Sequence, residues 1–208
     1  MGILQYELDL NFSIMGIKAR QIIDSRGYPT IEVEVITEGS GVGIFAAPAG
    51  ASRGVHEACE RRDKDDKRFM GKGVYTAVKL VNEEIAQALL GMDARRQYEI
   101  DAKLIEIDGT PNKSRIGGNA IVATSMAVAL AAANTYGIPF YRYIGGLQAN
   151  ILPVPMMNII NGGKHAGNEL AIQEFMIVPA GVDSFHEALR VGCEVYYQLK
   201  RLLKETYG

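Results

Sequence analysis

Two loops in this sequence combine residue types that could perform chemistry. Residues 48–54 read Pro-Ala-Gly-Ala-Ser-Arg-Gly, with small side chains, free backbone N–H groups and the Ser52 hydroxyl. Such a loop can close over a phosphate or bind a hard cation. Residues 161–168 read Asn-Gly-Gly-Lys-His-Ala-Gly-Asn and are followed by Gln173 and Glu174. A histidine can donate a hydrogen bond to an anion, and a glutamate can move a proton.

Each loop also has an ordinary structural interpretation. Most loops of Gly, Ala and Ser are simply surface loops. A hairpin with an exposed His165 and an ion-paired Glu174 explains the second loop as well as chemistry does. A third cluster, Asp24-Ser25-Arg26-Gly27, stands just before Pro29 and is more simply a turn with an Asp–Arg pair.

Composition excludes several classes of protein. The 208 residues are 48% hydrophobic and 22% charged, with a formal net charge of −2. This near-neutral balance argues against a nucleic-acid binder. The sequence contains no long apolar stretch that is free of charged residues, so no membrane span is expected. The most apolar long run, residues 116–136, is expected to form a buried helix. Cys59 and Cys193 form neither a disulfide framework nor a zinc site. Without a secretory signal, a soluble cytoplasmic protein is expected.

The first part of the chain predicts three strands followed by helices. Residues 17–23, 31–35 and 42–47 have strand character and are separated by turn residues, which indicates an antiparallel meander. Helical periodicity runs from Val74 to Leu89, and Asp93 is expected to cap a second helix that ends near Glu106. We therefore predict an α+β domain over residues 15–149, after an N-terminal extension of residues 1–14.

Residues 150–208 predict a second, smaller segment. Strands at 153–160 and 171–178 flank the glycine-rich loop, and Ser184 with Glu187 matches a capping box. The helix that follows is expected to bury one apolar stripe, made of Phe185, Leu189, Gly192, Val195, Leu199 and Leu202. Two strands and one helix cannot cover both faces of a sheet. We therefore expect further polypeptide after Gly208, or another chain, to complete this segment.

A series of short motifs resembles the enolase (phosphopyruvate hydratase) family in the same order, with archaeal members nearest. The motifs are Asp24-Ser25-Arg26-Gly27, residues 48–54, Asp108-Gly109-Thr110-Pro111-Asn112-Lys113-Ser114, Asn119-Ala120-Ile121, Leu152-Pro153-Val154-Pro155, residues 161–168 and Gln173-Glu174-Phe175-Met176. The match covers only the N-terminal half of the family's usual length. The resemblance implies an α+β N-terminal domain, followed by the opening ββα of an incomplete TIM-type barrel.

The resemblance implies a specific reaction. Enolases remove a proton from carbon 2 of 2-phospho-D-glycerate and expel the carbon-3 hydroxyl, giving phosphoenolpyruvate in glycolysis and gluconeogenesis. Two Mg²⁺ ions stabilise the enediolate. Carried over to this sequence, Ser52 is a ligand of the second Mg²⁺, and His165 and Glu174 are catalytic, with Glu174 near the leaving hydroxyl. The implied substrate-binding residues are Gly50, Ala51, Ser52, His165, Gln173 and Glu174.

The chain departs from the family at two loop positions and in length. Family members usually have Ser where Ala49 stands and Thr where Arg53 stands. Arg53 either helps to hold phosphate or hinders closure of the loop. The family's acid/base glutamate, its three carboxylate ligands for the first Mg²⁺ and its lysine base all match positions beyond Gly208. We therefore expect the 208-residue chain to be inactive alone.

Several hypotheses follow for how the chain works. In the leading hypothesis, the chain is either a subunit of a split enzyme that pairs with a complementary C-terminal chain, or a truncated product. Its partner is then the complementary chain or further copies of itself in a homo-oligomer. A non-catalytic interaction module with the same fold is the first rival. Another acid/base lyase or racemase of the superfamily ranks last, because residues 161–174 resemble true enolases more. A neighbouring reading frame that carries the metal carboxylates would favour the split enzyme over the module.

Overall fold

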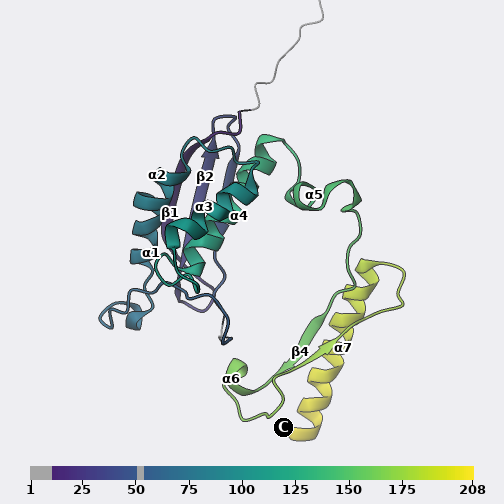
Figure 1. Ribbon diagram of the computed structural model, residues 1–208. Coiled ribbons are helices and arrows are strands. Elements are labelled where there is room, and N and C mark those ends of the chain that lie inside the picture. Colours follow the sequence, from purple (N-terminus) through teal and green to yellow (C-terminus); the bar gives the residue numbers. More distant parts are fainter. Residues whose placement is uncertain (1–10, 51–53) are drawn as a thin grey trace, which may run out of the picture. The chain divides into compact units, whose positions relative to one another are not determined.

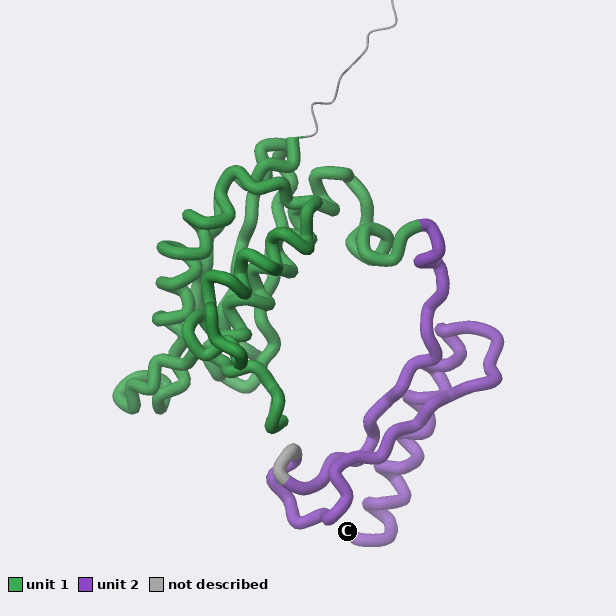
Figure 2. The backbone as a smooth tube through the Cα atoms, viewed as in Figure 1, with its two compact units in different colours: residues 1–146 green, residues 147–208 purple. Residues whose placement is uncertain are grey.

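The structure, a computed structural model, describes residues 11–50 and 54–208, without the side chains of Lys164 and His165. The chain forms two compact units, residues 1–146 and 147–208 (Figure 2).

The sheet of the first unit is the antiparallel meander that the sequence predicts. It consists of β1 (Ile14–Ile23), β2 (Pro29–Thr37) and β3 (Val42–Ala46), in the order β1-β2-β3. Ile31, Val33 and Val35 of β2 are buried. Glu32 and Glu34 alternate with them and pair with Arg20 of β1, at 2.6 and 3.0 Å between N and O. The alternation in sequence therefore separates the core face of the sheet from its polar face.

Helices α1 to α4 of the first unit lie on one face of this sheet (Figure 1). The predicted helix from Val74 to Leu89 is a continuous run of α1 (Tyr75–Leu80), a π-helical turn η2 (Val81–Ile85) and α2 (Ala86–Leu89). Asn82 lies in the π-helical turn. Its side-chain amide accepts from Ala19 N at 2.8 Å and donates to Ala19 O at 3.2 Å, so it pairs with the outer edge of β1.

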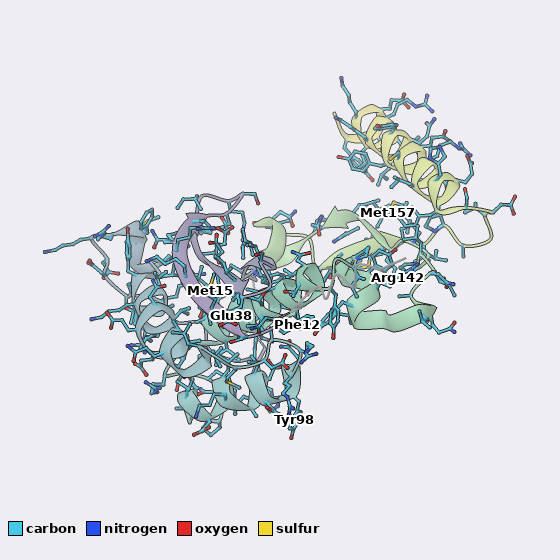
Figure 3. The ribbon with its side chains drawn as sticks, turned by 90° about the horizontal axis from the view of Figure 1, so that it is seen from above. Phe12, Met15, Glu38, Tyr98, Arg142 and Met157 are labelled. Atoms are coloured by element: carbon cyan, nitrogen blue, oxygen red, sulfur yellow. The ribbon has the colours of Figure 1, made fainter. Side chains whose placement is uncertain are left out.

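The prediction that Asp93 caps the next helix is wrong. That helix, α3, spans Gln97–Asp108 and begins after Arg96. The Asp93 carboxylate instead accepts from the Arg95 backbone N–H at 2.9 Å and from the Arg95 guanidinium at 2.6 Å. Asp is a favourable residue at the start of a helix, but Asp93 pairs with Arg95, two residues away, instead of capping α3. Tyr98 of α3 points into solvent (Figure 3).

Helix α4 (Gly118–Thr135) is the buried helix that the apolar run predicts. It packs unusually close to β3, because a Cβ atom added at Gly43 would lie 2.0 Å from the Ala127 carbonyl oxygen and 2.3 Å from Ala131 N. Among the described residues, α4 is the one helix with the length and apolar composition of a membrane span. Most of it is buried in the core, and core helices of other proteins share that composition.

The remaining parts of the first unit are short. They are η1 (Phe69–Gly71), α5 (Phe140–Gly145) and, at the boundary of the units, η3 (Gly146–Gln148). Phe12 precedes β1 and belongs to the core: its ring lies 4.4 Å from the Tyr136 ring and 4.5 Å from the Arg95 guanidinium (labelled in Figure 3).

The second unit is a hairpin with one long helix. Strands β4 (Met157–Asn161) and β5 (Glu174–Ile177) pair antiparallel, α6 (Gly163–Ala166) lies between them, and α7 spans Phe185–Tyr207. Both strands are shorter than predicted, and β4 begins after Pro153 and Pro155 because these residues have no N–H to donate to a ladder. The Ser184 hydroxyl caps α7 by accepting from Glu187 N at 3.2 Å, as predicted.

The apolar stripe predicted to be buried along α7 is largely exposed. Phe185 is 40%, Leu189 46% and Leu202 53% exposed, whereas Ala188 and Gly192 are the buried residues of α7. The hairpin is too small to cover a helix of 23 residues. The prediction of burial is therefore wrong for the described residues, although the amphipathic pattern that prompted it is present.

Candidate functional site

The glycine-rich loop of the second unit approaches the following strand very closely. Gly162 N donates to Gln173 O at 2.8 Å. A Cβ atom at Gly162 would lie only 2.2 Å from Ile172 O, so a larger residue there would push the loop away from the chain that leads into β5. Gly163 has φ +62° and begins α6 in the left-handed region, where glycine is favoured. The loop therefore needs glycine at both positions.

Asn168 fixes the two ends of this loop to each other. Its Oδ1 accepts from Gly163 N at 3.1 Å and from Leu170 N at 3.2 Å. Its Nδ2 donates to Asn161 O at 3.1 Å. The predicted loop therefore contains one helical turn, α6, and His165 belongs to that turn.

Glu174 lies at the base of the same loop. It is the cross-strand partner of Asn161 and is exposed. Its Oε2 accepts from Asn158 Nδ2 at 2.9 Å, and the same Nδ2 lies 2.5 Å from Asn161 Oδ1. A solvent-facing carboxylate held by one amide donor is oriented and accessible to a ligand. Sequence reasoning missed Asn158, which no local spacing distinguishes from other strand residues.

The other predicted loop belongs to the first unit. Ala51, Ser52 and Arg53 lie outside the described residues, and Gly50 is exposed. The structure thus places the backbone of His165 together with Gln173 and Glu174 in one unit.

The turn at Asp24 is tightly built and reaches the loop of the first unit. Asp24 Oδ1 accepts from Tyr28 N at 2.8 Å and from Arg26 N at 2.9 Å, and these hydrogen bonds hold the pKa of the Asp24 carboxyl below its usual range. Arg26 Nη2 donates to Ala49 O at 2.6 Å. The sequence predicted the turn but not this contact, because 23 residues separate its partners.

Metal ligands are scarce in the described part of the chain. It contains no group of three or more His, Cys, Asp or Glu side chains that could hold a metal ion. Glu174 therefore has no partner carboxylates with which to form a Mg²⁺ site of its own, since Mg²⁺ favours several oxygen ligands. The described residues alone do not fit the two-ion centre that the resemblance implies.

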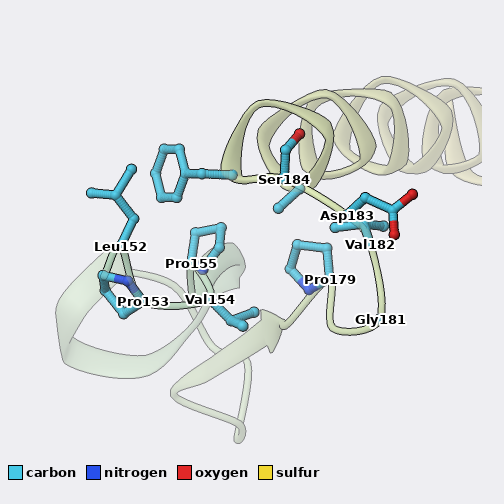
Figure 4. A pocket seen from close by; sticks show the side chains of 11 residues that line it. Leu152, Pro153, Val154, Pro155, Pro179, Gly181, Val182, Asp183 and Ser184 are labelled. Carbon is cyan, nitrogen blue, oxygen red and sulfur yellow. The ribbon is translucent and has the colours of Figure 1, made fainter. Parts of the chain in front are cut away.

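A cavity of about 210 Å³ in the second unit lies apart from the predicted site residues (Figure 4). It is lined by Pro153, Pro155 and Pro179 and by Phe185 at the start of α7. A second cavity, of about 250 Å³, lies in the first unit beside Pro48 and Glu57, next to the predicted loop.

Comparisons with known proteins cover nearly the whole chain. A family model described as the enolase N-terminal domain matches residues 14–144, and one described as the enolase C-terminal TIM barrel domain matches residues 149–208. The chain is 60% identical over 201 residues to the enolase of Methanocaldococcus jannaschii and 57% identical over 201 residues to that of Methanococcus aeolicus. Each match covers 97% of this chain and 47% of the relative.

The chain thus spans about half the length of the curated relatives that it matches. The comparisons confirm the predicted resemblance and fold class, an α+β domain followed by the start of a TIM barrel domain. This chain belongs to the enolase family.

Proposed function

We propose that this chain is the N-terminal portion of a phosphopyruvate hydratase that acts in the cytoplasm. The reaction converts 2-phospho-D-glycerate reversibly into phosphoenolpyruvate and water. The observation that carries the proposal is 60% identity to an enolase, maintained over 201 residues that span both units.

Each predicted site residue has a role in this proposal. Carbon 2 loses its proton, the bond between carbon 3 and its hydroxyl oxygen breaks, and the hydroxyl leaves as water after gaining a proton. Glu174, oriented by Asn158 at 2.9 Å, lies near the leaving hydroxyl in this proposal, and the acid/base glutamate that transfers that proton comes from the complementary half. His165, Gln173, Gly50, Ala51 and Ser52 contact the substrate in this proposal.

This chain would supply only one of the Mg²⁺ ligands in this proposal. The hydroxyl of Ser52 would offer one oxygen ligand to a Mg²⁺ ion, and the bound ion would stabilise negative charge on the substrate. The other ligands must come from outside the described residues, which hold no suitable cluster.

The exposed apolar surface of the second unit supports a complementary polypeptide. Phe175 and Met176 of β5 and Leu189 and Leu202 of α7 are about half exposed. Within the described residues, β4 and β5 pair only with each other. A two-stranded hairpin is marginally stable without further strands or packing. We therefore propose that the remaining part of the barrel covers this surface, in the same chain or as a second chain.

Mixing experiments test the proposal. The 208-residue chain should show no formation of phosphoenolpyruvate by ultraviolet absorbance. Addition of the C-terminal half of the Methanocaldococcus jannaschii enolase with Mg²⁺ should start turnover. Glu174→Gln in the mixture should reduce turnover by about 100-fold or more, the usual loss when a group that stabilises charge in the transition state is removed.

The outcomes separate the hypotheses clearly. Arg190→Gln, which removes exposed ion pairs with Glu187 and Glu194 on α7, is the control and should leave turnover intact. Turnover by the pure 208-residue chain would contradict the need for a complement. A mixture that forms a stable complex but remains inactive would favour the non-catalytic interaction module.

A further inference from the structure

Strand β4 carries one extra residue opposite β5. On β4, Asn158 and Ile160 are separated by Ile159. Their partners on β5, Met176 and Phe175, are consecutive, so the extra residue is unpaired. This arrangement is a β-bulge, which bends a strand and redirects the side chains beside it. The bulge therefore changes which side chains of β4 face the same way.

The bulge places Asn158 and Asn161 on the same face of the hairpin. Side chains of a regular strand alternate between two faces, so residues three positions apart point in opposite directions. Asn158 Nδ2 nevertheless lies 2.5 Å from Asn161 Oδ1. Glu174 is the cross-strand partner of Asn161 and shares that face, because directly opposed side chains lie on one side of a sheet. Without the extra residue, Asn158 would point away from Glu174.

The side-chain amide of Asn158 joins these two residues. Its Nδ2 donates to Glu174 Oε2 at 2.9 Å and to Asn161 Oδ1 at 2.5 Å, so both of its N–H groups are used. Asn161 is itself held, since its backbone carbonyl accepts from Asn168 Nδ2 at 3.1 Å. Within the described residues, Glu174 Oε1 accepts no hydrogen bond, so this oxygen is the one that can contact a ligand.

We propose that Asn158 is a positioning residue, which the bulge directs at the Glu174 carboxylate. This inference rests on the proposed function, in which Glu174 lies near the leaving hydroxyl. An exposed glutamate can adopt several rotamers, and one charge-assisted hydrogen bond to Oε2 favours the rotamer that presents Oε1. A small misplacement of a group at the reacting atoms lowers the rate strongly, so the orienting amide matters for turnover. Asn158 itself does not touch the substrate.

Nuclear magnetic resonance tests the hydrogen bond without any activity. Spectra of the 208-residue chain, with isotope-labelled asparagine, are recorded alone and with the C-terminal half of the Methanocaldococcus jannaschii enolase. Glu174→Ala should move a side-chain N–H resonance of Asn158 upfield, because that hydrogen loses its charged acceptor. Glu169→Ala, which removes an exposed carboxylate between β4 and β5, is the control and should leave this resonance in place. An Asn158 resonance that Glu174→Ala moves in neither sample would overturn the proposal.

Turnover in the mixture with the complementary half tests the positioning role. Asn158→Leu keeps the size of the side chain but has no donor, so it should lower kcat by about tenfold to 100-fold with little change in KM. Asn158→Gln keeps a donor and should recover part of this loss. Asn150→Leu makes the same substitution at an exposed asparagine of the second unit and should match the parent. Parent-like kcat in Asn158→Leu would overturn the proposal.

A double-substitution cycle separates positioning from structural support. Because Asn158 acts through Glu174, adding Asn158→Leu to Glu174→Gln should lower kcat by less than about twofold further. Full additivity of the two losses, or a loss of kcat that only follows a loss of Tm, would show a merely structural role. A parent mixture without activity would overturn the enolase proposal, while the resonances would still decide whether Asn158 holds Glu174.

Discussion

Buried Asp108 joins the end of α3 to the segment that leads into α4. One carboxylate oxygen accepts from the backbone N–H of Thr110 at 3.0 Å and from the Thr110 hydroxyl. The other accepts from Ile116 N at 2.7 Å. Burial opposes ionisation of this carboxyl, but the hydrogen bonds outweigh it, so the pKa of Asp108 lies below its usual value.

Asp108→Asn should therefore lower the free energy of unfolding by about 2 kcal/mol at neutral pH, because an amide cannot accept at both positions. The depressed pKa also gives a pH dependence. The stabilisation is complete above the unfolded-state pKa of about 4 and is lost as the pH falls through the lower, folded-state pKa. Urea unfolding at several pH values measures both effects.

The control for this substitution is Asp66→Asn, which changes an exposed carboxylate. It should leave the unfolding curve at neutral pH unchanged. If the parent and Asp108→Asn lost stability in parallel below pH 4, Asp108 would have no part in the acid sensitivity.

Most of what could be predicted about the candidate site came from the types of its residues. The types and order of residues 161–174 pointed to Glu174 and to the glycines, and the structure shows why Gly162 must be small. The sequence could not reveal the contact of Arg26 with Ala49, since it depends on how β1 and β2 bring distant residues together.

Among the elements, α4 and β3 define the tightest packing of the first unit. The backbone of Ala127 and Ala131 occupies the space where a side chain on Gly43 would lie. Backbone cannot move aside as the end of a flexible side chain can. The position therefore accepts only glycine without a shift of the helix or the strand.

Gly43→Ala should destabilise the chain by about 3 kcal/mol, because the new methyl group must push α4 from the sheet. Gly16→Ala is the matched control, since a Cβ atom there would meet nothing within 4 Å. Thermal unfolding followed by circular dichroism compares the two. Equal Tm values would mean that the close approach of α4 to β3 is not a constraint.

Hydrophobic periodicity predicted whether an element is helical better than it predicted the irregular turns and the burial of that element. The apolar positions from Val74 to Leu89 predicted one helical run, and that run exists. Its π-helical turn accompanies the pairing of Asn82 with Ala19, a contact over 63 residues that no local pattern encodes. Likewise, the stripe on α7 indicated an apolar face correctly, but the pattern could not tell what covers it.

For the whole molecule, the two units differ in how well their helices are covered. Helix α4 is mostly buried, whereas α7 exposes most of its apolar side chains. Local stability follows the buried apolar contacts of a segment. The first unit should therefore be the stable part of the 208-residue chain.

Hydrogen exchange over the whole chain should show this difference. Amides of α7 should exchange faster than those of α4 in the 208-residue chain, and the complementary half should slow α7 while leaving α4 unchanged. Residues of α3 in the first unit serve as an internal reference. If α7 were already as protected as α4 without the complement, the exposed face would not be an interface.

The amide of Asn82 has a consequence for self-association. By occupying the backbone groups of Ala19 on β1, it prevents another strand from joining the outer edge of the sheet there. Among the described residues of the second unit, a side-chain amide occupies the backbone of the hairpin only at the end of β4, where Asn168 donates to Asn161 O. Precipitates or fibrils of the purified chain should therefore nucleate at β4 and β5, and a charged residue on that edge would keep the protein in solution.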